Sequence, residues 1–297
     1  MTDIIPPPVV VGVDGSSESR VALAWAVEEA TRRKRTLHLL CAWHSDYAAE
    51  TTAPMVPSIE DDCRSILDAA FEDARTLSPG IQVRTATVHA QAAAALIAAS
   101  RHADTVVVGS RGRGAVKEAL AGSTSMQLAA YGSCPVVVVR ETSSRAELTQ
   151  RVVVGVDGSD LSTEAAGYAF EEAAQRGCGL TVLHAWDTTV YSSSLAMSVL
   201  VDTWTDLEVE QDVITSAAIA GWTQKYPDVD VRTHVIQGPP ADILVDASVG
   251  AELVVVGSRG RGGFKGLLLG SVSRTVLHRA HCPVAVIRPH QHDDSHS

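Results

Sequence analysis

The chain has 297 residues, 45% of them hydrophobic and 20% charged, a composition that excludes disorder for most of its length. Its formal net charge of −11 argues against a broad basic face that binds nucleic acid or an anionic membrane surface. We see no apolar run of the roughly 20 residues that span a bilayer, no signal peptide and no CxxC among the five cysteines. We therefore expect a cytoplasmic protein with no membrane insertion and no nucleic-acid partner.

Short Val-rich runs alternate with helical segments along the chain. This alternation predicts an α/β fold, a doubly wound, five-stranded, mostly parallel sheet with helices on both faces. Ligands of such sheets bind beyond the carboxyl ends of the strands, where the strand order reverses. The expected elements are a strand beginning at Val9, a helix at Glu18–Arg35 (Ser162–Arg176 in a second copy), a strand at Leu37–Ala42, a helix at Ser58–Thr76, a strand at Gln82–Val88, a helix at Ala92–Arg101, a strand at Thr105–Val108, a helix at Ser123–Ala130 and a strand at Val136–Val139.

The whole pattern occurs twice. The octapeptide VVVGVDGS at residues 9–16 returns at 152–159, an offset of 143, and VVVGSRGRG at 106–114 returns at 254–262, an offset of 148. A repeat of this length is a duplicated domain, because solenoid repeats are much shorter. The second copy has gained five residues, which lie between Trp186 and Val231. The predicted domains are residues 1–145 and 146–290, followed by a disordered tail at 291–297.

A Gly-rich segment follows the fourth strand of each copy. It reads GSRG from Gly109, then nine residues, then Gly122-Ser123, and the same spacing separates Gly257 from Gly270-Ser271. Glycine lets backbone N–H groups approach a ligand, and a helix N-terminus offers unpaired N–H donors and a partial positive charge. The spacing predicts a phosphate site. The alternative that these glycines only shape turns remains open, and the P-loop, dinucleotide and nucleophile-elbow patterns are absent.

An aspartate ends the first strand of each copy, Asp14 in one and Asp157 in the other. In a doubly wound sheet the first and fourth strands flank the switch point, so this carboxylate faces the Gly-rich segment. It would accept a hydrogen bond from a ribose hydroxyl or an adenine amino group, or bind Mg²⁺. The alternative is a carboxylate that caps the next helix.

Basic residues follow each GSRG segment. They would neutralise phosphate, or else they form a solvated basic loop. The histidines have no metal-ligand spacing, so we predict no metal site. The basic residues are Arg111, Arg113 and Lys117 in the first copy and Arg259, Arg261 and Lys265 in the second.

The spacing G-x2-G-x9-G-[ST] after a Val-rich strand, with an aspartate ending the first strand and a CPV strand closing each copy, resembles the universal stress protein family. The resemblance covers nearly the whole chain, twice, and is to the ATP-binding branch in its tandem-domain, actinobacterial form. It implies a strand order of 3-2-1-4-5 with ATP at the switch point, with or without Mg²⁺. It also implies pairing through the fifth strands, between the two domains or in a homodimer, and an unidentified regulatory protein partner.

The resemblance assigns adenine to the ends of the first two strands and the phosphates to the Gly-rich segment. No catalytic residue is assigned. The expected nucleotide-binding residues of the first copy are Gly12, Asp14, Ala42, Gly109, Ser110, Arg111, Gly112, Arg113, Gly114, Gly122, Ser123 and Thr124. Those of the second copy are Gly155, Asp157, Ala185, Gly257, Ser258, Arg259, Gly260, Arg261, Gly262, Gly263, Gly270, Ser271, Val272 and Ser273.

The two copies differ where the family usually has a G-x-P turn before the third helix. The second copy keeps that turn at Gly238-Pro239-Pro240, whereas the first has Ala90-Gln91-Ala92. We therefore expect the second site to bind better than the first.

Four functions remain open. The preferred hypothesis is an ATP-dependent regulator of stress response, dormancy or growth. The others are a binder of cyclic AMP or another adenine nucleotide, a slow ATPase or phosphotransferase, and an interaction module with empty loops. Efficient catalysis is not expected, because no second acidic partner accompanies either aspartate.

Overall fold

The computed structural model describes residues 6–44, 56–112, 122–140, 149–186, 200–261 and 268–289, without the side chains of 56–58 and 200–210. These residues form two compact units, one from each half of the sequence. The boundary predicted between 145 and 146 and the tail at 291–297 lie outside the described residues.

Unit 1 is a parallel five-stranded sheet with the strand order β3-β2-β1-β4-β5. The predicted fold class and strand order are confirmed, and the elements begin and end close to the expected residues. The elements are β1 (Val9–Gly12), α1 (Ser17–Arg33), β2 (Leu37–Trp43), α2 (Val56–Leu77), β3 (Val83–His89), α3 (Ala92–Ser100), β4 (Thr105–Gly109), α4 (Ser123–Tyr131) and β5 (Val136–Val139).

Unit 2 repeats this topology as β8-β7-β6-β9-β10, again with parallel neighbours. α6 has 26 residues where its counterpart α2 has 22. The elements are β6 (Arg151–Val156), α5 (Asp160–Arg176), β7 (Gly179–Trp186), α6 (Leu200–Lys225), β8 (Val231–Gln237), α7 (Pro240–Ala247), β9 (Leu253–Gly257), α8 (Ser271–Arg279) and β10 (Val284–Ile287).

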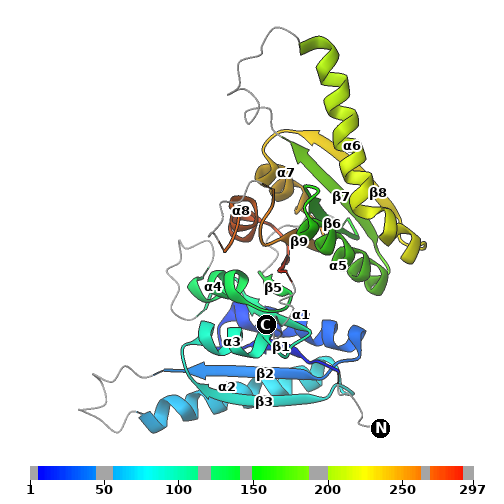
Figure 1. Cartoon of the computed structure of the whole chain (residues 1–297). Coiled ribbons are helices and arrows are strands. Elements are labelled where there is room, and N and C mark those ends of the chain that lie inside the picture. The colour runs from blue at the N-terminus through cyan, green and yellow to red at the C-terminus, as the bar shows by residue number, and fades with distance from the viewer. Residues whose placement is uncertain are drawn as a thin grey trace, which may run out of the picture. The chain divides into compact units, whose positions relative to one another are not determined.

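Helices cover both faces of each sheet. α1 packs against α2 and α3 against α4 in unit 1, while α5 packs against α6 and α7 against α8 in unit 2 (Figure 1). The central strands are therefore buried on both sides, as their unbroken valine runs predict. Val106, Val107 and Val108 of β4 are at most 4% exposed. No helix in the described ranges is long and apolar enough to cross a membrane.

The first helix of unit 1 ends earlier than its sequence predicts. We expected it to continue to Arg35, but Lys34 takes a left-handed conformation at φ 53° and ends α1 at Arg33. In unit 2 the corresponding residue is Gly177, at φ 65°. The two helices thus end with the same backbone geometry, although only one has the residue that this geometry favours.

The first two helices of each unit pack through different residues. In unit 2, a Cβ atom on Gly167 of α5 would lie 2.7 Å from Cε2 of Trp222, so only glycine leaves room for this indole on α6. The corresponding residues of unit 1 are Ala24 and Ala74, at offsets of 143 and 148. Unit 1 therefore has two small residues at the positions where unit 2 pairs a small residue with a large one, and its helices α1 and α2 are in contact as well.

Candidate functional site

In each unit, the described part of the predicted site lies at the carboxyl edge of the sheet. β1 pairs with β2 on one side and β4 on the other, and β6 lies in the same way between β7 and β9. The strand order therefore reverses beside β1 and β6, and this edge is the ligand position of a doubly wound sheet (Figure 1).

Asp14 and Asp157 orient the serine that begins the next helix. The Asp14 carboxylate accepts from the Ser16 N–H at 3.0 Å and from its hydroxyl at 2.6 Å. Ser16, in turn, is the N-cap of α1 and accepts from the Ser19 N–H at 3.1 Å. Asp157 makes the same two bonds with Ser159 at 3.0 and 2.6 Å. The alternative that Asp14 and Asp157 cap the next helix is thus wrong, because Ser16 and Ser159 are the N-caps of α1 and α5.

The Gly-rich segment lies directly against these carboxylates. A Cβ atom on Gly112 would lie 2.7 Å from Oδ2 of Asp14, and a Cβ atom on Gly260 would collide with Oδ2 of Asp157. Residues separated by about a hundred positions in sequence are therefore in contact at the switch point. Glycine is required at these two positions because any side chain would displace the aspartate.

A hydrogen bond at the base of each Gly-rich loop holds its two ends together. The Gly122 N–H donates to the Ser110 carbonyl at 2.7 Å, and the Gly270 N–H donates to the Ser258 carbonyl at 2.8 Å. A serine hydroxyl donates to the same carbonyl in each unit, from Ser125 at 3.4 Å and from Ser273 at 2.9 Å. These contacts bring the GSRG segment next to the helix that follows the loop.

That helix begins without a side-chain cap in both units. The N-cap residues are Gly122 for α4 and Gly270 for α8, and neither end has a side-chain cap bond. Ser123 and Ser271 are the first helical residues and are exposed. An uncapped helix N-terminus leaves its first N–H donors available to an anion.

Asp157 is ionised at neutral pH. Burial acts to raise its pKa, but the hydrogen bonds donated by Ser159 and by the Arg261 N–H outweigh burial and hold the pKa below its ordinary value. The Arg261 N–H lies 2.7 Å from Oδ2 of Asp157. A charged carboxylate in this position is an acceptor for hydroxyl or amino hydrogens and a ligand for a hard cation.

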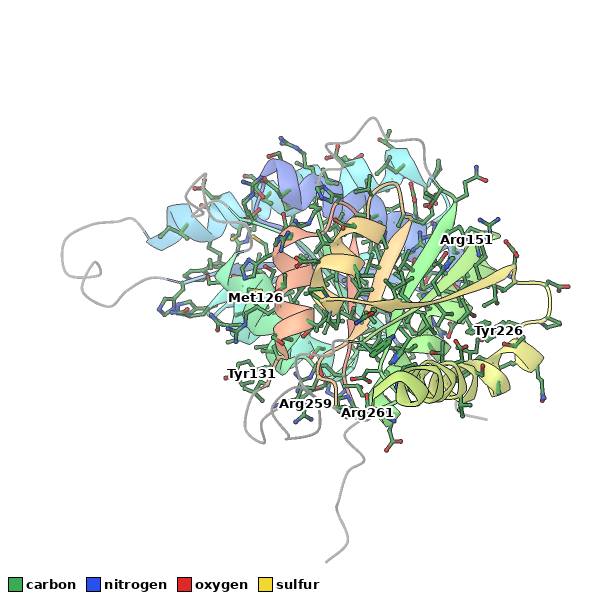
Figure 2. All side chains as sticks on the ribbon, turned by 90° about the horizontal axis from the view of Figure 1, so that it is seen from above. Met126, Tyr131, Arg151, Tyr226, Arg259 and Arg261 are labelled. Atoms are coloured by element: carbon green, nitrogen blue, oxygen red, sulfur yellow. The ribbon has the colours of Figure 1, made fainter. Side chains whose placement is uncertain are left out.

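The basic residues of unit 2 gather at the same edge. The Arg261 guanidinium donates to the Gly158 carbonyl at 3.2 Å, which holds it beside the loop that follows β6. Burial and the nearby charge of Arg259 lower the pKa of Arg288. Arg259 and Arg261 lie near each other and away from Arg151, which begins β6 (Figure 2). Positive charge is thus local in a chain of net charge −11.

In unit 1 the counterpart of Arg259 is Arg111, and it is paired with a carboxylate. Arg111 forms an ion pair with Glu18 of α1 at 3.2 Å, and the Ser17 hydroxyl and this arginine lower the pKa of Glu18. Leu161 stands in place of Glu18 in unit 2, so α5 offers Arg259 no carboxylate at this position. The acidic neighbour reduces the positive charge that the first site offers an anion.

Several other predicted residues belong to the packing around the site. A Cβ atom on Gly12 would lie 3.1 Å from Leu96 of α3, and one on Gly155 would lie 2.9 Å from Leu244 of α7. These glycines let the third helix of each unit approach the sheet. Arg113, Gly114, Lys117, Gly262, Gly263 and Lys265 lie outside the described residues.

The strand ends assigned to adenine also differ between the units. Ala42 and Ala185 occupy the same place near the ends of β2 and β7, and both are partly exposed. In unit 1 the neighbouring Trp43 stacks on His89 with ring centroids 4.2 Å apart. In unit 2 the turn after β8 uses Gly238 at φ 149°.

Sequence reasoning missed the residues that support the site. Ser16 and Ser125 were not assigned roles, yet Ser16 holds Asp14 and the Ser125 hydroxyl donates to the Gly122 carbonyl at 2.9 Å. The Asp-Gly-Ser pattern was an available signal for the first of these, because an aspartate often accepts from the N–H two residues later. Among the described residues, no three His, Cys, Asp or Glu side chains cluster in a way that would hold a metal ion.

Comparisons with known proteins agree with this architecture. The model of the family described as "Universal stress protein family" matches residues 7–140 and 149–288. A universal stress protein of Mycolicibacterium smegmatis is 37% identical over 95% of this chain and 97% of its own length. One of Mycobacterium tuberculosis is 36% identical over 94% of this chain and 96% of its own. The crystal structure of a universal stress protein from Archaeoglobus fulgidus has a TM-score of 0.69 at 21% identity, covering 97% of this chain and 98% of that one. The chain therefore belongs to the universal stress protein family and carries two copies of its domain.

Proposed function

We propose that each domain binds an adenine nucleotide, ATP, at the carboxyl edge of its sheet, and that occupancy regulates the protein in a stress response. The observation that carries the proposal is the contact between an aspartate and a glycine of the loop, beside an uncapped helix, in both domains. It combines a carboxylate acceptor with a set of N–H donors, and a nucleoside phosphate needs both.

Each part of the nucleotide then has a defined partner. The N–H groups at the start of α4 or α8, with Ser123 or Ser271, would hold the phosphates. Asp14 or Asp157 would accept from the ribose or the adenine amino group, or hold Mg²⁺ on the phosphates. Ala42 or Ala185 would lie against the base. The clustered arginines of the second domain would add charge-assisted hydrogen bonds.

Regulation would act through the Gly-rich loop. A nucleotide that binds one conformation of the loop more tightly shifts the protein toward that conformation. A partner protein that binds the surface of the loop would then bind with a different affinity when nucleotide is present. The same proposal includes two further predictions. The fifth strands pair, either between the two domains or in a homodimer, and a regulatory protein binds the chain.

The direct test is to purify the protein, denature it and chromatograph the small molecules released. ATP at a stoichiometric amount supports the proposal. Release of cyclic AMP instead would support a different nucleotide at the same site. No released nucleotide, together with no binding of added ATP or cyclic AMP, would overturn it.

A second assay separates a regulator from an enzyme. Phosphate release from ATP and Mg²⁺ is measured for the wild type and for Asp157→Ala. We expect at most slow release. Turnover of many molecules a minute, lost in the variant, would instead assign a catalytic role to Asp157.

A further inference from the structure

Two cysteine thiols meet inside unit 1. The Cys41 and Cys63 sulfur atoms are 2.8 Å apart, and they join β2 to α2 although 22 residues separate them in sequence. Cys41 is 2% exposed and Cys63 is 6% exposed. Neither is in a disulfide. A disulfide bond measures about 2.05 Å, so closing the bond needs an approach of only about 0.75 Å.

The same position in unit 2 holds a polar pair that makes the same connection. His184 corresponds to Cys41 at the offset of 143, and Gln211 corresponds to Cys63 at the offset of 148. The His184 Nε2 lies 2.8 Å from the Gln211 side-chain oxygen, and its Nδ1 lies 2.8 Å from the Val156 carbonyl. Both units thus link the second strand to the second helix with a buried side-chain pair, but only unit 1 does so with thiols.

We propose that Cys41 and Cys63 are a disulfide-forming modification site, oxidised by peroxide. The Cys63 thiol, the more exposed of the two, attacks hydrogen peroxide, which forms a sulfenic acid and releases one water molecule. The Cys41 sulfur then attacks the sulfenic sulfur, and the sulfur–sulfur bond forms as the second water leaves. Two thiols lose two electrons and two protons, and one peroxide is reduced to two water molecules.

The other three cysteines are not arranged for this reaction. Exposure does not single out the pair, because Cys134 and Cys178 are partly exposed whereas Cys41 and Cys63 are buried. The Cys134 sulfur lies 3.4 Å from the Pro135 carbonyl. Cys282 is buried, and its sulfur lies 3.3 Å from the Pro283 carbonyl. The contact between two sulfurs is therefore the feature that distinguishes Cys41 and Cys63.

The disulfide would fix one edge of the first candidate site. Cys41 immediately precedes Ala42, which lies at the carboxyl end of β2, and the Cys63 sulfur lies 3.9 Å from the Ala42 carbonyl. Unit 2 has no cysteine in these positions, so oxidation would act on one domain only. This inference does not depend on the identity of the ligand, because the bond forms between protein atoms.

The experiment treats the reduced full-length protein with hydrogen peroxide, quenches it in denaturant with an alkylating agent, and maps the peptides by mass spectrometry. Trypsin cleaves after Arg35 and Arg64 and at no site between them, so both cysteines fall in one peptide, residues 36–64. We expect the oxidised peptide to carry no alkyl group and to weigh two hydrogen atoms less than the reduced, unalkylated peptide. Treatment with reductant before alkylation should restore both thiols. Peptides with the other three cysteines should stay fully alkylated.

Three controls make the assignment specific. Protein unfolded before oxidation should form mixed disulfides among all five cysteines, because the native contact is gone. Cys178→Ala should leave the disulfide intact, and Cys63→Ala should abolish it. If the native wild type keeps both alkyl groups in peptide 36–64, or gains only sulfinic acid there, the proposal is wrong. The wild-type result decides this even if a variant fails to fold.

Discussion

At the scale of single residues, the candidate site depends on two glycines that contact two aspartates. Neither aspartate is exceptional in sequence, since an aspartate before Gly-Ser is an ordinary turn and cap signal. What distinguishes them is the close contact with Gly112 and Gly260, which lie about a hundred residues later in the sequence. The repeated Gly-rich spacing pointed to these glycines. The sequence predicts that each aspartate faces the Gly-rich segment, but which residue of that segment contacts the carboxylate depends on how the chain folds back after the fourth strand.

Gly260→Ala should weaken nucleotide binding in the second domain without unfolding it. The added Cβ atom displaces the Asp157 carboxylate and the loop, and the loss of one hydrogen bond to a charged group corresponds to roughly tenfold to a hundredfold in affinity. Isothermal titration with ATP measures the change. The control is Gly221→Ala on α6, where nothing lies within 4 Å of the new atom. Equal affinities in the two variants would contradict the site.

The lowered pKa of Asp157 makes stability depend on pH. Its folded pKa lies below the ordinary value of 3.8, so the charged form stabilises the fold above that value. The contribution is lost as the pH falls from 3.8 through the lowered folded pKa. Asp157→Asn should therefore be less stable than the wild type near neutral pH, and the difference should shrink at about pH 3. Thermal unfolding at both pH values measures this. A difference that does not change with pH would mean that the charge of Asp157 is not stabilising.

At the scale of helices and strands, the two copies show which features the sequence pattern determines. Unbroken valine runs and flanking glycines predicted β4 and β5 to within a residue because strands buried on both faces need that pattern. The end of α1 was predicted two residues too late, because the sequence gives no sign that Lys34 adopts a left-handed conformation. The contact of Cys41 with Cys63 was also missed, since it depends on how α2 packs on β2.

The two helix ends provide a matched test of backbone strain. Gly177→Ala places a side chain at φ 65° with nothing within 4 Å, so strain alone should destabilise unit 2 by about 1 kcal/mol. Lys34→Gly relieves the same strain in unit 1 and should stabilise it by up to about 1 kcal/mol. Urea denaturation of each variant gives the two values. The explanation fails if both substitutions change the free energy of unfolding in the same direction.

Gly167→Ala should destabilise the second domain even though alanine is the better helix former. Its Cβ atom would lie 2.7 Å from Cε2 of Trp222 and force α5 and α6 apart, at a cost of about 1–3 kcal/mol. Gly221→Ala, in open space on α6, should instead stabilise the domain by up to about 1 kcal/mol. Chemical denaturation compares them. Stabilisation by both changes would show that α5 and α6 do not pack through this contact.

At the scale of the whole molecule, duplication has produced two domains with the same topology and different sites. The second has Arg261 beside Asp157 and a positive-φ glycine in the turn after β8. The first has Arg111 paired with Glu18 and a thiol pair beneath the end of β2. We therefore expect the second domain to bind nucleotide more tightly and the first to respond to oxidant. The repeat and the Gly-Pro turn of the second copy can be read from the sequence, whereas the ion pair of Arg111 with Glu18 and the contact of the two thiols depend on residues that are distant in sequence.

The most direct test of the central claim is the stoichiometry of ATP binding to the full chain, measured by equilibrium dialysis. Two ATP molecules per chain are expected for the wild type, the tighter in the second domain. Gly260→Ala should weaken the tighter site roughly tenfold to a hundredfold, and Gly112→Ala with Gly260→Ala should weaken both sites. Absence of saturable binding to the wild type, or two ATP molecules bound at wild-type affinity by the double variant, would contradict the account.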